Sequence, residues 1–275
     1  MEKEQALLRF LYPPDALKKI VAVVSRFPRI PFMSIIAGSG WKDVVEGQVL
    51  EIFSYQDFGI PFHHDVEGHS DQVRLLEKDN IPILVFGGRL HLYQGYRYEE
   101  IVLPVIVSFL SGVKVLLITN AAGSLHWKIP PGNLCLLTDQ VDFTFVPDPP
   151  VFRNKPCFSA ELCHLAWKAA QNKGFSLFQG TYVGVLGPSF ETPAEIRMLA
   201  RFGQVVGMST VKETKMAANL GLPVCGFSLV TNWGSGMISL PLSHQEVLEL
   251  SLRSKHLMQE FTSALIQEVS RAWRL

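Results

Sequence analysis

The sequence has few cysteines, no long apolar run and no excess charge of either sign, and each absence argues against a class of protein. Its four cysteines form no C-x-x-C pair and lie at no zinc-finger spacing from a histidine, so we expect reduced thiols, mostly buried. No run reaches the roughly 18 apolar residues of a membrane-spanning helix. The segment MEKEQALLRF (1–10) lacks the layout of a signal peptide, so we expect a cytoplasmic protein with no membrane partner.

The charge balance is even. Lysine and arginine number 25, aspartate and glutamate also number 25, and the formal net charge is zero. Nucleic-acid binding needs a basic surface, so this balance argues against a nucleic-acid partner. Hydrophobic residues make up 48% of the 275, enough for a large core, and we find no repeat, low-complexity tract or linker. The sequence therefore predicts one domain over residues 1–275.

Short apolar runs rich in Val, Ile and Leu recur along the chain, and several end abruptly in glycine or a small polar residue. Such runs are typical of buried strands. They occupy residues 32–40, 81–89, 113–123, 133–143, 181–189, 204–210 and 224–232. Because helical patterns separate them, the sequence predicts an α/β fold with a central mixed sheet flanked by helices.

Three capping-box sequences mark expected helix starts. Thr192–Glu195, Thr210–Glu213 and Ser243–Glu246 each place Ser or Thr three residues before Glu. Gly203 and Gly221 stand where the first two helices are expected to stop. The third box opens one long C-terminal helix.

Polar residues follow the ends of the expected strands, where ligands bind in sheets of this kind. A planar arginine beside a histidine suits phosphate, and glycine turns and helix N-termini favour anions. Each segment taken singly also fits a plain turn, a helix cap or a surface side chain. Together they predict a polar small-molecule site that includes Ser39, Arg89, His91, Asn120, Ala121, Glu191, Ser209 and Asn232.

Seven segments together resemble the trimeric purine nucleoside phosphorylases, in the family's order. They are GSG (38–40), GRLHLYQGY (88–96), TNAAG (119–123), GTYVGVLGPSFET (180–192), VVGMSTVKE (205–213), GFSLVTN (226–232) and SHQEVL (243–248). The resemblance implies a nucleoside phosphorylase-like fold, a homotrimer, and reversible phosphorolysis of inosine, guanosine and their deoxy forms in purine salvage. It implies inorganic phosphate as co-substrate and no cofactor or metal.

Matched position by position, the resemblance implies roles for individual residues. The phosphate-binding set is Ser39, His69, Arg89, His91, Ala121 through its N–H, and Ser209. The nucleoside-binding set is Tyr93, Phe190, Glu191, Val206, Met208, Thr231, Asn232 and His244. Within these sets, Asn232, Glu191 and His91 are the expected catalytic residues, and Asn232 donates to N7 of the base. Phe152 or Phe158 is the aromatic expected to reach the neighbouring subunit's ribose site.

The chain departs from the family's usual sequence at several points. Trp41–Asp43 follows GSG in place of small residues, Gln94 replaces a glutamate, and Gln140 replaces a histidine. The segment 146–158 is shorter than usual, and the lid sequence 233–236 differs.

Two alternatives stay open. One is a methylthioadenosine phosphorylase. Glu191 and Asn232 argue against it, because that branch places an aspartate where this chain has Asn232. The other is a nucleoside-binding protein that has lost catalysis, against which the complete phosphate-binding set argues.

Overall fold

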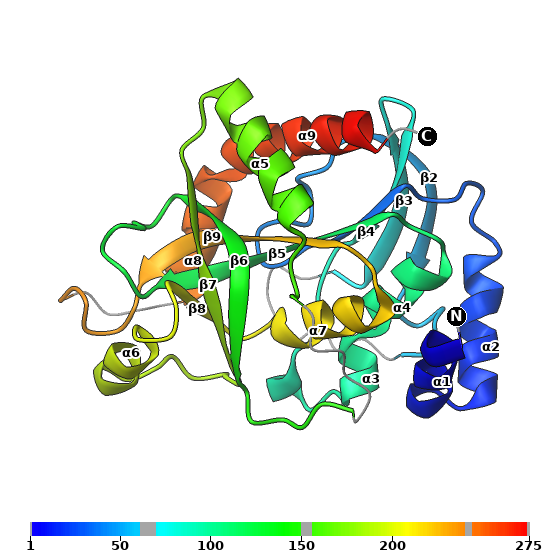
Figure 1. Cartoon of the computed structure of the whole chain (residues 1–275), viewed down its shortest axis with the longest axis horizontal. Helices are drawn as coiled ribbons and strands as arrows, with labels where there is room; N and C mark the ends of the chain where they lie inside the picture. The colour runs from blue at the N-terminus through cyan, green and yellow to red at the C-terminus, as the bar shows by residue number, and fades with distance from the viewer. Residues whose placement is uncertain (1, 61–69, 150–155, 240–243, 274–275) are drawn as a thin grey trace.

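The computed structural model describes residues 2–60, 70–149, 156–239 and 244–273. In these ranges the chain forms a nine-stranded mixed sheet with helices on both faces, which confirms the predicted fold class (Figure 1). The strands are β1 (Met33–Ile36), β2 (Gln48–Ser54), β3 (Gln72–Lys78), β4 (Ile81–Phe86), β5 (Val115–Ser124), β6 (Leu134–Phe143), β7 (Leu177–Val185), β8 (Val205–Gly207) and β9 (Val224–Trp233).

Helices fill the intervals between the strands. They are α1 (Glu2–Leu11), α2 (Pro14–Val24), α3 (Tyr98–Ile101), α4 (Leu103–Leu110), α5 (Ala160–Lys173), α6 (Pro193–Leu199), α7 (Val211–Leu220), α8 (His244–Arg253) and α9 (Lys255–Ala272), with a short 3₁₀ turn, η1, at Leu92–Gln94. None of the helices in the described ranges is both long and apolar enough to cross a membrane.

The sheet places four parallel strands side by side. Its order is β2-β3-β4-β1-β5-β8-β7-β6-β9, and β9 also pairs with β5, which closes the last five strands into a ring. Strands β4, β1, β5 and β9 run parallel to their neighbours in this group. Their carboxyl ends therefore meet at one edge, where α/β folds bind ligands.

Two strands were missed by the sequence analysis. β2 and β3 form the antiparallel outer edge of the sheet. β2 exposes Val49 and Ile52 and buries Phe53, so its apolar residues lie on both faces and form no continuous buried run. An edge strand with one covered face does not need the apolar run of a central strand.

The helices cover the sheet in two layers. In Figure 1, α5 and α9 cross one face together, whereas α4 and α7 lie on the other, with α1 and α2 near the β2 end. Phe261 of α9 packs edge-on against Phe227 of β9, with ring centroids 4.9 Å apart and both side chains 1% exposed. Fully burying a side chain of this size contributes roughly 1.5–3 kcal/mol, so these layers hold the sheet rigid.

The structure confirms one capping box and corrects another. Thr192 and Glu195 cap α6 reciprocally, with Glu195 Oε2 accepting from the Thr192 backbone N–H at 2.7 Å. The second box is wrong: Thr210 has φ +74° and makes no side-chain cap, and the Glu213 carboxylate instead pairs with Arg89. The cause is tertiary, because a buried arginine competes for the carboxylate that a capping box needs.

Two helix ends also differ from expectation. α6 ends at Leu199 with Ala200 as its C-cap, so Gly203 lies beyond the stop. The predicted long C-terminal helix is two helices, α8 and α9, separated by Ser254. Gly221, by contrast, caps α7 in the left-handed conformation as predicted. All four cysteines are free thiols; Cys135 and Cys225 are buried and the others half-buried.

Two lysines of α7 bind two aspartates, Asp142 near the end of β6 and Asp148 in the segment after it. Lys212, with a side chain only 2% exposed, donates to Asp142 Oδ2 at 2.8 Å and to Asp148 Oδ1 at 3.0 Å. Lys215 donates to Asp142 Oδ2 at 2.7 Å and to Asp148 Oδ2 at 2.6 Å. Burial alone would raise the pKa of Asp142, but hydrogen bonds from Lys212, Lys215 and Thr144 outweigh it and lower that pKa to about 2.

Asp142→Asn should therefore destabilise the protein at neutral pH by about 1–3 kcal/mol, the scale of a hydrogen bond to a charged group. A carboxylate whose folded-state pKa is depressed stabilises the fold above its unfolded pKa and loses this effect as the pH falls toward its folded pKa. The difference between wild type and Asp142→Asn in the free energy of unfolding should therefore reach its full size above about pH 5 and shrink as the pH falls toward 2. Urea unfolding at pH 7 and pH 3 measures it. Asp139→Asn, an exposed change on the same strand, is the control, and a difference that persists undiminished at pH 3 would contradict the assignment.

Candidate active site

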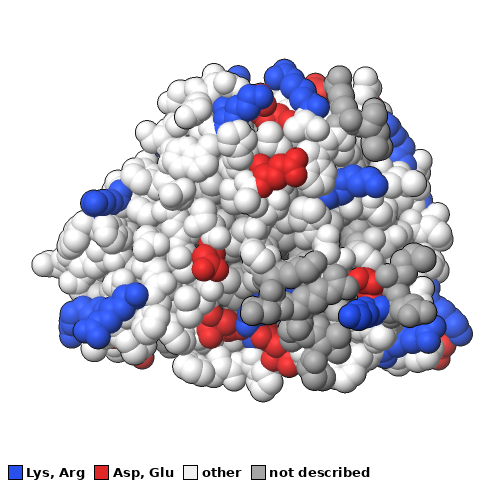
Figure 2. All heavy atoms as spheres, viewed as in Figure 1, with Lys and Arg blue, Asp and Glu red and all other residues white. Residues whose placement is uncertain are grey.

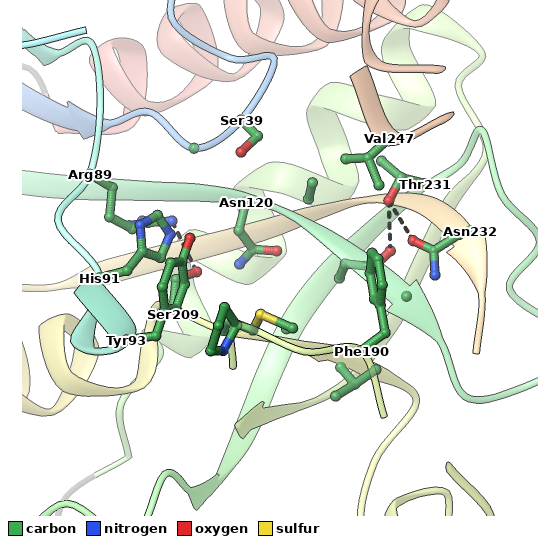
Figure 3. A pocket seen from close by; sticks show the side chains of 18 of the residues that line it. Ser39, Arg89, His91, Tyr93, Asn120, Phe190, Ser209, Thr231, Asn232 and Val247 are labelled. Carbon is green, nitrogen blue, oxygen red and sulfur yellow. Dashed lines mark hydrogen bonds between the residues drawn. The ribbon is translucent and has the colours of Figure 1, made fainter. Parts of the chain in front are cut away.

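A cavity of about 240 Å³ opens at the edge where the parallel strands end. Its wall contains Ser39, Arg89, His91, Tyr93, Ala121, Phe190, Glu191, Val206, Met208, Ser209, Thr231 and Asn232. All of these were predicted from the sequence as site residues. Figure 3 shows Arg89, His91, Tyr93 and Ser209 at one end of the cavity, and Phe190, Thr231 and Asn232 at the other.

Strand direction explains much of this convergence. Ser39 follows β1, Arg89 follows β4, Ala121 lies near the end of β5, and Asn232 lies near the end of β9. Because these strands run parallel, their last residues share one edge of the sheet. Ser209 arrives differently, from β8, which is antiparallel to β5.

Arg89 anchors the first end of the cavity. Its side chain is 2% exposed, and its Nε donates to Glu213 Oε1 at 2.7 Å. Its Nη1 donates to the Thr119 carbonyl at 2.9 Å and to Ser209 Oγ at 3.2 Å. Glu213 and Thr119 thus fix the guanidinium plane at the cavity wall, where a planar set of N–H donors suits a tetrahedral anion.

His91 stands beside Arg89 and is held by Gln94. The Gln94 Oε1 accepts from the His91 backbone N–H at 3.0 Å, which fixes which amide atom faces the histidine. His91 Nδ1 lies 3.3 Å from the same oxygen, so Gln94 contacts both the backbone and the ring of His91. The ring also stacks on Tyr93, with centroids 4.9 Å apart and planes 24° apart. Gln94, in place of the family's glutamate, therefore orients the imidazole without a negative charge.

Asn232 lies at the other end of the cavity, and Glu191 also lines it. Asn232 Oδ1 accepts from the Thr231 hydroxyl at 2.9 Å, and its Nδ2 donates to the Trp233 carbonyl at 3.1 Å. These contacts set the orientation of the amide. Burial raises the pKa of the half-buried Glu191 carboxyl, its own backbone N–H lowers it, and the charge of Glu195 raises it, for a net increase. Phe190, 41% exposed, lies at the same end of the cavity as Asn232.

This arrangement separates two kinds of chemistry within one cavity. Cationic and hydroxyl donors gather at the Arg89 end, an amide stands at the Asn232 end, and the Glu191 carboxyl also belongs to the cavity wall. The first end suits an anion, and the second suits a flat heterocycle with both donors and acceptors.

The family model described as Phosphorylase superfamily matches residues 33–267 of this chain. The chain is 33% identical over 270 residues to purine nucleoside phosphorylase 1 of Bacillus subtilis, which covers 92% of this chain and 98% of that protein. It belongs to the purine nucleoside phosphorylase family.

Solved structures of this family match its fold. The Schistosoma mansoni purine nucleoside phosphorylase in complex with adenosine has a TM-score of 0.80 and 30% identity, and covers 93% of this chain and 97% of that one. The complex of the same enzyme with inosine has a TM-score of 0.79 and 30% identity, and covers 92% and 96%.

Of the two aromatics predicted to reach a neighbouring subunit, the structure argues against Phe158, and several other predicted site residues lie outside the described residues. Phe158 is 6% exposed in the hydrophobic core and packs beside Gly226, so its ring is not available to a neighbouring subunit. His69 and Phe152 lie outside the described residues. His244 begins α8, but its side chain is outside the description as well.

Asn120, predicted as a polar residue at a strand end, also lines the cavity. Three further residues were not in the predicted set: Val247 lines the cavity, and Glu213 and Trp41 hold its wall from behind. Asn120 donates to Thr210 Oγ1 at 2.9 Å and accepts from Ser228 Oγ at 2.6 Å, so its amide ties β5 to the start of α7. Its position at a strand end was a usable signal, whereas nothing local in the sequence marked Val247.

Another departure from the family pattern also acts behind the wall. Gln140 of β6 donates to the Val211 carbonyl at 3.2 Å and accepts from Thr214 Oγ1 at 2.6 Å. Both partners lie in the first turn of α7, the helix that carries Glu213. Gln140 therefore holds this helix against the sheet.

Proposed function

We propose that this chain catalyses the reversible phosphorolysis of inosine and guanosine, and of their deoxy forms, to a free purine and ribose 1-phosphate or deoxyribose 1-phosphate. The observation that carries the proposal is one cavity with an anion end at Arg89 and a base end at Asn232. In the cytoplasm this reaction would serve purine salvage. Phosphate is itself the nucleophile, so the reaction needs no cofactor.

At the anion end, phosphate would bind between Ser39, Arg89, His91, Ser209 and the Ala121 N–H. A phosphate oxygen attacks C1′ of the sugar as the bond from C1′ to N9 breaks. The protein forms no covalent bond, so positioning and charge stabilisation supply the rate. The fixed guanidinium of Arg89 suits this task, because its hydrogen bonds to Glu213 and Thr119 are already made before phosphate arrives.

At the base end, the electron pair of the broken bond passes to the purine. Asn232 Nδ2 uses one hydrogen on the Trp233 carbonyl and offers the other to N7, where negative charge develops. Thr231 supports this orientation by donating to Asn232 Oδ1. Ionised Glu191 would accept from the N1 proton that a 6-oxopurine carries, and in guanosine from the 2-amino group.

The direct test is incubation with inosine in the presence and absence of phosphate. We expect hypoxanthine release that depends on phosphate, with ribose 1-phosphate as the second product. Phosphate-independent release of free ribose would identify a hydrolase, and nucleoside binding without turnover would identify a binding protein. Methylthioadenosine cleaved faster than inosine would favour the other phosphorolytic branch.

We also propose that the protein assembles as a homotrimer. An apolar surface patch, here called the Phe145 patch, surrounds Phe143 and supports self-association. Phe145 is 86% exposed, and its ring centroid lies 6.1 Å from that of Phe143. Phe202 is 46% exposed, and its ring centroid lies 5.1 Å from that of Phe143. Exposed apolar clusters of this kind mark interaction sites. Figure 2 shows scattered charges of both signs with wide uncharged areas between them.

Sedimentation should therefore give three times the chain mass of 30.7 kDa. Phe145→Asp should shift the protein to smaller species, because a charge in a buried apolar interface is costly. Val49→Asp, at an exposed apolar position of the distant strand β2, is the control. A fully active monomer would overturn the trimer.

A further inference from the structure

Trp41 is an unusual residue to find immediately behind an anion-binding loop. It is completely buried, at 0% exposure, directly after the Gly38–Gly40 turn. Its indole Nε1 donates to the Asn120 carbonyl at 3.2 Å, 79 residues along the chain. Because a buried indole N–H needs a partner, this bond fixes the ring in one orientation.

The turn before Trp41 is packed tightly on β5. The Trp41 backbone N–H donates to the Gly38 carbonyl at 3.0 Å, which closes the turn around Ser39. The Gly38 N–H donates to Thr119 Oγ1 at 3.2 Å, and a side chain at Gly38 would meet the Thr119 carbonyl at 2.6 Å. Gly40 has φ +80°, which favours glycine. Ser39 is thus held at the cavity by a turn that Trp41 terminates.

The indole bond also acts on the far side of β5. The peptide between Asn120 and Ala121 is planar and trans, so its N–H points opposite to its carbonyl. Trp41 holds the Asn120 carbonyl, and Ala121, whose N–H belongs to the same peptide, lines the cavity. A hydrogen bond to the carbonyl also polarises the peptide and strengthens its N–H as a donor.

We propose that Trp41 is a positioning residue for the phosphate co-substrate, acting through the Asn120–Ala121 peptide and the Ser39 turn. This inference rests on the proposed phosphorolysis. The indole then orients the Ala121 N–H, and the backbone N–H of the same residue closes the turn that carries Ser39, so one residue serves two anion donors from different strands. A side chain that merely filled the core would instead affect stability without distinguishing phosphate from nucleoside.

Trp41→Phe tests this, because it removes the indole N–H and keeps an aromatic ring. We expect the phosphate KM to rise roughly twofold to tenfold, the range of one neutral hydrogen bond, with the inosine KM at saturating phosphate nearly unchanged. The control is Trp167→Phe, the same exchange in a partly buried tryptophan of the same apolar cluster. It should leave both constants unchanged.

A second variant covers the case in which Trp41→Phe does not fold. This variant carries benzothienylalanine in place of Trp41 and no other change. The side chain keeps the bicyclic shape of the indole but has sulfur where the indole has its N–H. It should reproduce the rise in phosphate KM. An unchanged phosphate KM in this variant, or equal rises in both constants, overturns the inference. Loss of phosphate dependence in the wild-type enzyme would instead overturn the proposed function itself, so the two failures are distinguishable.

Discussion

Arg89→Met is expected to raise the phosphate KM by about tenfold to hundredfold. A hydrogen bond to a charged group contributes roughly 1.5–3 kcal/mol, and each 1.4 kcal/mol is a factor of ten. Arg89 sits at the anion end with its plane fixed by Glu213 and Thr119. Initial rates at varied phosphate and saturating inosine measure the effect, and the inosine KM should change much less.

The same variant leaves Glu213 buried without its cation, which should destabilise the protein by about 3–5 kcal/mol. The double variant Arg89→Met with Glu213→Met separates the two effects. Replacing a buried ion pair by apolar side chains of similar volume is often neutral for stability, so the double variant should regain most of the loss. Its phosphate KM should stay high. Arg97→Met, an exposed arginine paired with Glu99, is the control. A normal phosphate KM in the stable double variant would remove Arg89 from the phosphate site.

Inosine and guanosine are expected to exceed adenosine in kcat/KM by at least about 100-fold, because a site built to pair a polar group rejects analogues that lack it. The 6-oxopurines present an N1 proton to the Glu191 carboxylate, whereas adenine presents an N1 lone pair. The Schistosoma mansoni relative has been crystallised with adenosine. Binding of adenosine is therefore a poor test of base preference, and turnover is the measurement to use. Asn232→Asp should narrow the gap, since a carboxyl accepts from the 6-amino group and, when protonated, donates to N7.

The pH dependence of this preference tests Glu191 separately. Burial raises the pKa of its carboxyl, so the carboxylate is lost at a higher pH than for an ordinary glutamate. As the pH falls through that raised pKa, the preference for inosine over adenosine should shrink, because a protonated carboxyl can donate to the adenine N1. In Glu191→Gln, the ratio of kcat/KM for inosine to kcat/KM for adenosine should be small at every pH. Glu51→Gln, at an exposed glutamate of the distant strand β2, should behave as wild type. Equal kcat/KM for adenosine and inosine in the wild-type enzyme would show that Glu191 does not read N1.

The residues behind the cavity show where sequence reasoning stopped. Thr210 and Glu213 have the spacing of a capping box, yet Glu213 pairs with Arg89 across 124 residues. Trp41 stood out only as a departure from a family pattern, and its hydrogen bond to the Asn120 carbonyl is equally long-range. Phe158, one of two aromatics predicted as candidates to reach a neighbouring subunit, lies in the core. Local patterns cannot rank a local partner against a distant one.

The sequence by itself determined the α/β class, the strands β1, β4, β5 and β9, and the polar residues that follow them. Those features depend on local apolar runs and on the rule that parallel strands end at one edge. Only the tertiary structure decided that β5 and β9 pair directly, that Glu213 orients Arg89, and that Trp41 holds the Asn120 carbonyl. These contacts join residues far apart in the chain, and burial decides them, since a buried charge or N–H must take whichever partner the packed fold provides.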